Sequence, residues 1–405
     1  MDWSTLVEGP AGMIAGRLLA NDVADYVRFR AVCRPWRQCS ADPRAHGILD
    51  RRFHPRRWIM LREKVADPDR HRLLNVSTGQ CVRAHLPELR GHDVCSPTVE
   101  GLLVLLNRGT YAVRLLNPLT RQVADLPPAT TLYPLLRWAG MYDAVPRLDF
   151  EVSGAGLADD DTIAVVFEEV QMLAVVKPGD EEWTLVEQGI SLSPAISFAG
   201  RFYCTCASDK DIKMLDTRDN QPPRLVVAAK INHQFSGLAN TAHLLDNDGE
   251  LMLLTRSLTA EARYFMQYKV YRVDLDARKS QPIRDLGGRA IFVGSSGAIS
   301  VSPLAFPTIR NDSVYLGKDH VVGNNLESIG PYKVMDGTGT TLIFDAGSDV
   351  TEACGFDNGD RDIITGYGPR SIVDCLSQYV TKGVVVSFAE EDTSDSDAEA
   401  NCIIC

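Results

Sequence analysis

A unit made of a strand, a polar turn and a second strand recurs through most of this 405-residue chain. One apolar run ends at Asn75 in Asn-Val-Ser-Thr, and a similar run ends at Asn117 in Asn-Pro-Leu-Thr, 42 residues later (117 minus 75). Each is followed by a Leu-Pro pair, at Leu86 and at Leu126. Looser copies follow at 176–186, 214–227, 271–286 and 332–344. One outer hairpin per four-stranded blade would give this spacing, so the sequence predicts a β-propeller of six or seven blades.

Side chains inside these segments alternate as they do in strands that are covered on both sides. In the segment 268–273, Val270 and Arg272 share one face, while Tyr271 and Val273 share the other. Neither face is polar throughout, as expected where blades stack against each other. A β-sandwich would place its turns closer together and less regularly. The large domain is therefore expected to be mainly β and to span 71–388.

The first 45 residues follow a helical period instead. Large apolar residues recur at spacings of three and four, which predicts one apolar face on a helix from about Pro10 to Ala20; they are Trp3, Leu6, Pro10, Met13, Ile14 and Leu18. Asn21 and Asp22 are good N-cap residues for a second helix. A third short segment, rich in aromatics and arginines, runs from Phe29 to Arg37. Three short helices cannot bury so many large side chains alone, so we expect a partner protein to cover some of them.

These residues closely resemble the F-box family. The resemblance rests on Trp3-Ser4-Thr5-Leu6, on Ile14-Ala15 with Leu18, and above all on Phe29-Arg30-Ala31-Val32-Cys33 to Trp36-Arg37. F-box modules bind the Skp-type adaptor of a cullin-RING ubiquitin ligase. The resemblance implies an adaptor and a cullin scaffold as partners, with adaptor contacts at Leu6, Pro10, Ile14, Leu18, Val32 and Trp36.

The chain departs from the usual F-box pattern at three positions. The family has proline after the first leucine, whereas Val7 follows Leu6 here. Gly12 and Gly16 lie inside the first predicted helix. A glycine inside a helix costs about 0.5 to 1 kcal/mol relative to alanine. These departures would weaken adaptor binding.

The later part of the chain resembles the KIB-type β-propeller found in plant F-box proteins. The match covers roughly 57–318 and is clearest at Trp183, in 197–203, in 249–254 and in 286–294. The expected organisation is an F-box at 1–45, a basic linker at 46–70, the propeller at 71–388 and an acidic disordered tail at 389–405. The resemblance implies a substrate-recognition subunit of an SCF-type ligase, whose propeller holds an unidentified target protein.

Two other classes of function remain open at this point. A propeller scaffold or inhibitor with a degenerate F-box would share this architecture without joining a ligase. A propeller glycosidase would need paired carboxylates that converge on the central channel, and no pattern in the sequence singles out such a pair. The preferred interpretation is a protein without catalytic residues of its own.

Charge is unevenly distributed along the chain. From Arg28 to Arg72 there are thirteen Arg or Lys residues against five Asp or Glu. The stretch from Arg51 to Trp58 mixes cations and aromatics, as nucleic-acid surfaces do. We interpret it as a linker whose aromatics pack on the propeller while its arginines face water, and we expect no nucleic-acid partner.

The acidic tail carries two candidate modification sites. Residues 390–399 include six acids and little to bury, which predicts disorder. Ser394 and Ser396 each have an acid three residues later, the pattern that acidophilic kinases use. Cys402 formally fits a C-a-a-X prenylation signal, although its upstream residues are acidic. Membrane association is expected only if Cys402 is lipidated.

Other motifs point away from cofactor chemistry. Gly154-Ala155-Gly156 lacks the third glycine of a dinucleotide loop, and Gly294-Ser295-Ser296-Gly297 has the wrong spacing for a nucleophile elbow and reads as a turn. Cys204 and Cys206 share one face of a strand and are interpreted as core residues, so no metal or cofactor is expected.

The cysteines, the apolar runs and the first residues of the chain together predict an intracellular location. Ten cysteines without an export signal are interpreted mostly as small buried hydrophobes. The longest conspicuous apolar run is strand-sized, far short of the roughly 18 residues that a membrane span needs. Acidic residues near the start, Asp2 and Glu8, do not fit a secretory signal, so the expected location is the cytoplasm, the nucleus or both.

Overall fold

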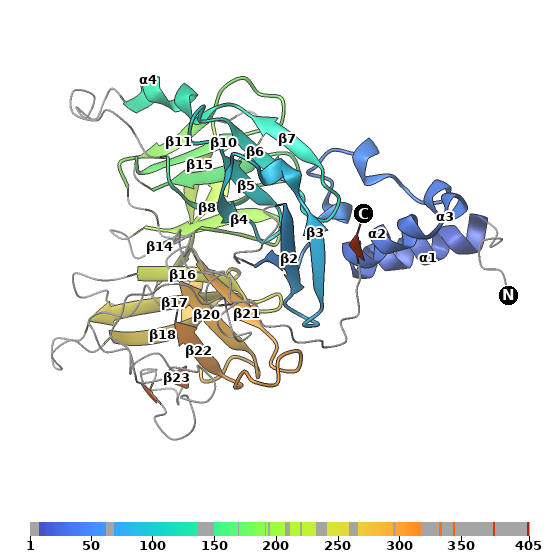
Figure 1. Ribbon diagram of the computed structural model, residues 1–405. Helices are drawn as coiled ribbons and strands as arrows, with labels where there is room; N and C mark the ends of the chain where they lie inside the picture. Colours follow the sequence, from blue (N-terminus) through green and yellow to red (C-terminus); the bar gives the residue numbers. More distant parts are fainter. Residues whose placement is uncertain are drawn as a thin grey trace, which may run out of the picture.

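The computed structural model places three N-terminal helices against one side of a β-propeller (Figure 1). It describes residues 8–61, 69–136 and 150–316, except 169, 191, 193–194, 207–210, 219–220, 232–240, 259–265 and 295–296, and also 332–333, 343–344, 376 and 403–404. The helices are α1 (Glu8–Asn21), α2 (Val23–Val32) and α3 (Arg34–Gln38). Shorter helical turns follow: η2 (Pro43–Ala45), η3 (Arg51–Phe53), η4 (Pro87–Leu89), η5 (Ala129–Leu132) and α4 (Tyr133–Leu136).

Within the described residues, the strands form six sheet units arranged as a ring. The second to fifth units are four-stranded antiparallel meanders. Their strands are β4 (Asp93–Pro97), β5 (Leu103–Leu106), β6 (Val113–Leu116) and β7 (Val123–Leu126); β8 (Val152–Leu157), β9 (Ile163–Phe167), β10 (Met172–Val176) and β11 (Thr184–Gln188); β12 (Ile196–Phe198), β13 (Arg201–Thr205), β14 (Asp211–Asp216) and β15 (Arg224–Lys230); and β16 (Thr241–Asp246), β17 (Leu251–Leu258), β18 (Met266–Asp274) and β19 (Lys279–Pro282). The fourth and fifth units are joined where Lys230 pairs with Lys279.

The first and sixth units depart from this simple order. The first contains β1 (Trp58–Met60), β2 (Arg70–Asn75) and β3 (Cys81–His85), and β25 (Ile403–Ile404) pairs in parallel with β3. The sixth contains β20 (Ala290–Gly294), β21 (Gly297–Val301), β22 (Ser313–Leu316), β23 (Tyr332–Lys333) and β24 (Ile343–Phe344), and its β22 runs parallel to β20. The structure thus places a propeller strand, β1, inside the range 46–70 that was expected to be a linker.

The six predicted hairpins are confirmed. Each hairpin is an antiparallel pair of strands that follow each other in the chain and belong to the same unit. The six pairs are β2–β3, β6–β7, β10–β11, β14–β15, β18–β19 and β23–β24. The repeated asparagines explain the first two turns. The Asn75 side-chain oxygen accepts hydrogen bonds from the amides of residues 77 and 78 at 2.9 and 3.2 Å, and Asn117 accepts from 119 and 120 at 3.1 Å each. Such side chains fix the turn that follows a strand.

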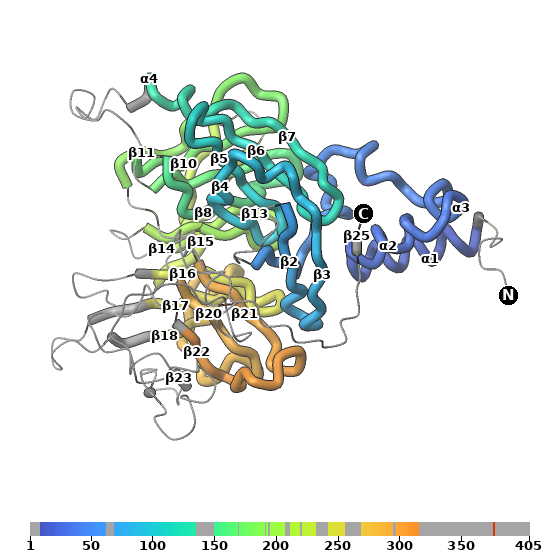
Figure 2. Tube along the Cα trace, viewed as in Figure 1, coloured from blue at the N-terminus to red at the C-terminus, as the bar shows by residue number. Residues whose placement is uncertain are grey.

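Alternate side chains of each strand pack toward the two neighbouring units. In β2, Leu73 packs toward the second unit, while Leu74 packs toward the sixth. In β18, Val270 packs toward the sixth unit and Tyr271 and Val273 pack toward the fourth, which confirms the predicted division of faces. Figure 2 shows the orange strands β20 and β21 returning beside the blue strand β2, where the ring closes.

Two of the motifs weighed for cofactor chemistry have structural roles. A Cβ on Gly156 of β8 would lie 2.1 Å from Ser197 Oγ of β12, so the glycine lets the inner strands of two blades approach closely. Gly294 pairs with Gly297 at the end of the β20–β21 hairpin, so the turn interpretation of that segment is confirmed. No helix in the described part of the chain has the length and apolar character needed to cross a membrane.

Candidate functional site

Helix α1 carries two apolar stripes where the sequence pattern predicted one. Its buried stripe is made of Ala11 and Ala15, which pack with the second helix. Its outward stripe carries larger side chains: Met13 is 66% exposed and Ile14 is 40% exposed, and Pro10 is also exposed. The prediction of a single face was therefore wrong. Small alanines allow close helix packing on one side, which leaves the larger side chains on the other.

The other predicted adaptor residues divide between surface and core. Val32, at the end of α2, is 63% exposed. Leu18 and Trp36 are only half-buried and pack on the small core of the helical module, where the Trp36 ring stacks on Phe29 with centroids 4.5 Å apart. Leu6 lies outside the described residues. We define the exposed apolar set as Pro10, Met13, Ile14 and Val32. Met13 was predicted to share the apolar face of the first helix, but it was not among the adaptor contacts that the F-box resemblance implied.

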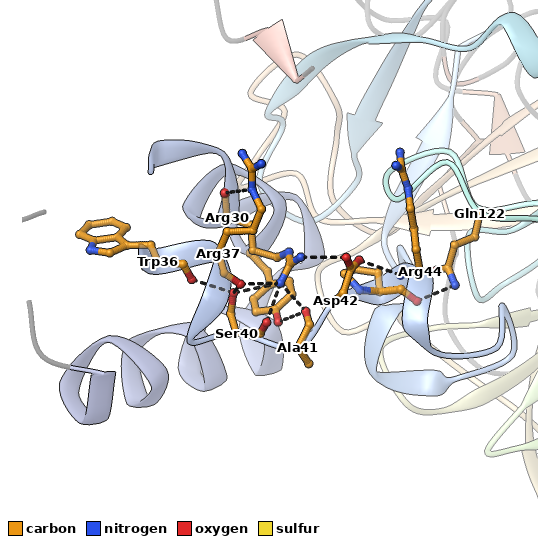
Figure 3. Close-up of polar contacts among 10 residues, drawn as sticks. Arg30, Trp36, Arg37, Ser40, Ala41, Asp42, Arg44 and Gln122 are labelled. Carbon is orange, nitrogen blue, oxygen red and sulfur yellow. Dashed lines mark hydrogen bonds and ion pairs between the residues drawn. The ribbon is translucent and has the colours of Figure 1, made fainter. Parts of the chain in front are cut away.

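A buried arginine holds the chain that follows α3. Arg30 Nη1 donates to the carbonyl oxygens of Ser40 and Ala41, both at 2.7 Å, to Ser40 Oγ at 3.0 Å and to Arg37 O at 3.2 Å (Figure 3). Its Nη2 also lies 3.3 Å from a carboxylate oxygen of Asp42. A cation suits this place because the carbonyls at a helix C-terminus carry partial negative charge.

The Arg30 network sets the position of Trp36. Ser40 Oγ donates to Trp36 O at 2.8 Å, and Arg37 Nε donates back to Arg30 O at 3.1 Å. Tyr26, beneath the arginine, donates its hydroxyl to Ala41 O at 2.6 Å. Trp36 itself points to the side away from the propeller in Figure 3. This role of Arg30 could not be predicted from the sequence, since an arginine in a helix is usually exposed.

The N-cap of α2 also connects the helices to the propeller. Asp22 Oδ1 accepts from the backbone amide of Ala24 at 2.7 Å, which confirms the predicted cap. Both Asp22 oxygens lie 3.0 Å from Trp58 Nε1, and Asn75 Nδ2 donates to Oδ2 at 2.8 Å. Around this carboxylate, Val23 packs in one hydrophobic cluster with residues of β1, β2 and β5.

The segment after the helices lies against turns of the propeller. Gln122 Nε2 donates to the carbonyls of Pro43 and His46 at 2.7 and 2.8 Å, and Asn117 Nδ2 donates to the carbonyl of Phe53 at 2.8 Å. Phe53 is buried, whereas Arg51 is exposed and pairs with Asp160 at 2.6 Å. Aromatic residues inside and arginines outside are what the linker interpretation of this stretch predicted.

His54 lies in this same segment and is 3% exposed. Burial, together with the nearby positive charge of Arg56, lowers the pKa of His54 from 6.5 to about 4. Protonation of His54 therefore favours the unfolded chain.

We expect the contribution of His54 to the free energy of unfolding to be complete above pH 6.5 and to fall by about 3 kcal/mol as the pH drops to 4. Urea unfolding at pH 7.5 and pH 5 should show a smaller loss for His54→Leu than for the wild type; an equal loss would contradict this account.

The remaining predicted sites give a mixed result. Cys204 and Cys206 are buried together between the third and fourth units, and burial raises the pKa of Cys204 to about 12, as suits a core residue. The broader expectation that most cysteines are buried was wrong for the described ones, since the other four are exposed or half-buried: Cys33, Cys39, Cys81 and Cys95. The candidate modification sites Ser394, Ser396 and Cys402 lie outside the described residues.

Among the residues that the structure describes, no three His, Cys, Asp or Glu side chains lie close enough together to hold a metal ion.

Comparison with known proteins gives a family for this architecture. The model of the KIB1-4 beta-propeller matches residues 56–336. The F-box protein At2g17036 of Arabidopsis thaliana is 22% identical over 341 residues, which span 75% of this chain and 80% of that protein. The F-box protein At3g56470 of the same plant is 24% identical over 131 residues, 32% of this chain and 33% of that protein.

Solved structures resemble the chain only distantly. YCF48 from Cyanidioschyzon merolae aligns with 56% of this chain and 86% of its own, with 10% identity and a TM-score of 0.33. The family match covers well over half of the chain and begins two residues before β1. With three N-terminal helices ahead of that propeller, as the first 45 residues predicted, this chain belongs to the KIB1-4 β-propeller family.

Proposed function

We propose that this chain is the substrate-recognition subunit of an SCF-type cullin-RING ubiquitin ligase. The observation that carries the proposal is the exposed apolar set. The propeller packs against the other side of the helices, through Val23 and Asp22, and leaves Met13, Ile14 and Val32 uncovered. A few exposed aliphatic and aromatic anchors with a polar rim are typical of a protein-binding surface.

The proposed role requires no chemistry from this chain. The helices would dock on a Skp-type adaptor, the propeller would hold a target protein, and the other ligase subunits would transfer ubiquitin. The contribution of such a receptor is a raised effective concentration of the target near the transfer machinery. The relatives named as F-box proteins support this role in its general form.

Direct binding tests the proposal. The purified full chain should bind a purified plant Skp-type adaptor in a titration by calorimetry, with a dissociation constant in the micromolar range or tighter. A propeller scaffold with a degenerate F-box would instead show no heat of binding while remaining folded. That result would overturn the ligase role.

Charge beside the exposed apolar set predicts how the complex responds to salt. Arg17, Arg34 and Arg37 are all exposed on α1 and α3. Rim charges act mainly on the association rate and are screened by salt. We expect Arg17→Glu with Arg34→Glu to slow association with an acidic adaptor surface about tenfold at low salt, with a much smaller effect in high salt. Stopped-flow measurements at both salt concentrations check this, and an equal effect at both would contradict it.

A further inference from the structure

We propose that Asp22 is a positioning residue that fixes the direction in which the three helices point relative to the propeller. Its carboxylate holds three parts of the chain at once: the first turn of α2, the indole of Trp58 in β1 and the amide of Asn75 at the end of β2. The functional consequence rests on the proposed ligase role. The orientation of the helices relative to the propeller does not depend on that role.

The geometry makes this junction specific. Trp58 is buried, and its one indole N–H donor is directed at the Asp22 oxygens. Asn75 is buried as well, and it uses its two ends differently: its oxygen caps the following turn, while its nitrogen reaches Asp22. A carboxylate that accepts three hydrogen bonds from groups in fixed positions has little freedom to turn. The start of α2 is therefore tied to two strands of the first unit, β1 and β2.

The surrounding contacts explain why one junction can govern the whole module. Helix α2 packs with α1 and α3, and the Arg30 network holds the chain after α3. A rotation of α2 about its first turn would therefore carry the exposed apolar set with it. The linker adds further contacts at Gln122 and Asn117, but these bind segments that follow the helices.

For a ligase receptor, this orientation decides where a target held by the propeller lies relative to the transfer machinery. A misplacement of the reacting groups lowers transfer without lowering binding, because proximity and orientation are separate from affinity. Asp22 thus has a role in transfer that is distinct from adaptor binding by the exposed apolar set.

The chain offers variants that separate the cap from the junction. Asp22→Ser keeps a good N-cap but is too short to reach Trp58 and Asn75. Asn75→Asp keeps the oxygen that caps its turn and places a second carboxylate against Asp22. Asp25→Asn is the matched control, because Asp25 lies on the same helix and pairs with Arg28 at 2.7 Å.

The test is a distance measurement on the full chain. Spin labels are attached through non-natural amino acids at two exposed positions, Gln38 on α3 and Glu182 on the propeller. The distance distribution should be narrow for the wild type and for Asp25→Asn, and roughly twofold broader for Asp22→Ser and Asn75→Asp. Unchanged distributions in both junction variants would overturn the proposal.

A second measurement links orientation to function. With adaptor, cullin and ubiquitin-loaded enzyme present, Asp22→Ser should bind adaptor as well as the wild type but should acquire self-attached ubiquitin several-fold more slowly. Equal rates would limit Asp22 to a structural role and would overturn its part in transfer. Failure of the wild type to bind adaptor would refute the ligase role instead, while the distance result would still decide whether Asp22 fixes the orientation.

Discussion

Ile14→Asp combined with Val32→Asp should weaken adaptor binding by at least about 100-fold while the chain stays folded. Both side chains are exposed, so the change adds no charge to the core. A central apolar anchor of an interface is worth roughly 2 kcal/mol or more, and burying a carboxylate against an apolar partner surface costs more still. Titration of the double variant with adaptor measures the loss.

The chain supplies a matched control for this experiment. Val123 on β7 of the propeller is 41% exposed, nearly the same fraction as Ile14. Val123→Asp should bind adaptor like the wild type. If the double variant binds as tightly as the control, the exposed apolar set is not the adaptor surface. Leu18 and Trp36 are less suitable targets, because both also pack in the core of the helical module.

Arg30→Ala should have the largest effect on the stability of the helical module, about 3 kcal/mol. The change removes the donors to Arg37 O, Ser40 O and Ala41 O and leaves these acceptors partly buried. Arg30→Lys should recover only part of the loss, since one ammonium group cannot match the planar fork of donors. Urea unfolding reports the change when it is followed by Trp36 fluorescence, obtained by subtracting the signal of the same chain with Trp36→Phe.

Arg37→Ala provides the comparison for that measurement. Arg37 is exposed, and its side chain donates one hydrogen bond, to Arg30 O at 3.1 Å. Its loss should cost less than about 1 kcal/mol. Equal losses for the two arginines would mean that the network around Arg30 is not what holds the segment after α3.

The propeller could be predicted from the sequence because its signals are local and repeated. Asn75 and Asn117 mark turns whose hydrogen-bond donors and acceptors lie within four residues of each other. The alternation of side chains around Val270 follows directly from the geometry of a strand. All six predicted hairpins follow from signals of this kind. The N-cap at Asp22 was predictable for the same reason.

Contacts between distant segments could not be predicted in this way. Nothing near Asp22 in the sequence indicates that Trp58 and Asn75 meet it, and Arg30 reads as a surface residue until the turn at Ser40 folds over it. The division of α1 into two stripes was missed because periodicity identifies apolar positions but not which of them a neighbouring helix covers. The parallel pairing of β22 with β20 likewise has no local signal.

The closure of the ring affects how the protein folds during synthesis. The side of the first unit that contains Ile59 and Leu74 is covered by Phe292, Val301 and Tyr315, more than two hundred residues later. Until the ribosome has released the sixth unit, that side is an exposed apolar sheet surface, and such surfaces promote aggregation and recruit chaperones. Premature termination before residue 290 should therefore produce an insoluble chain even though its helices and strands β1 to β19 are complete.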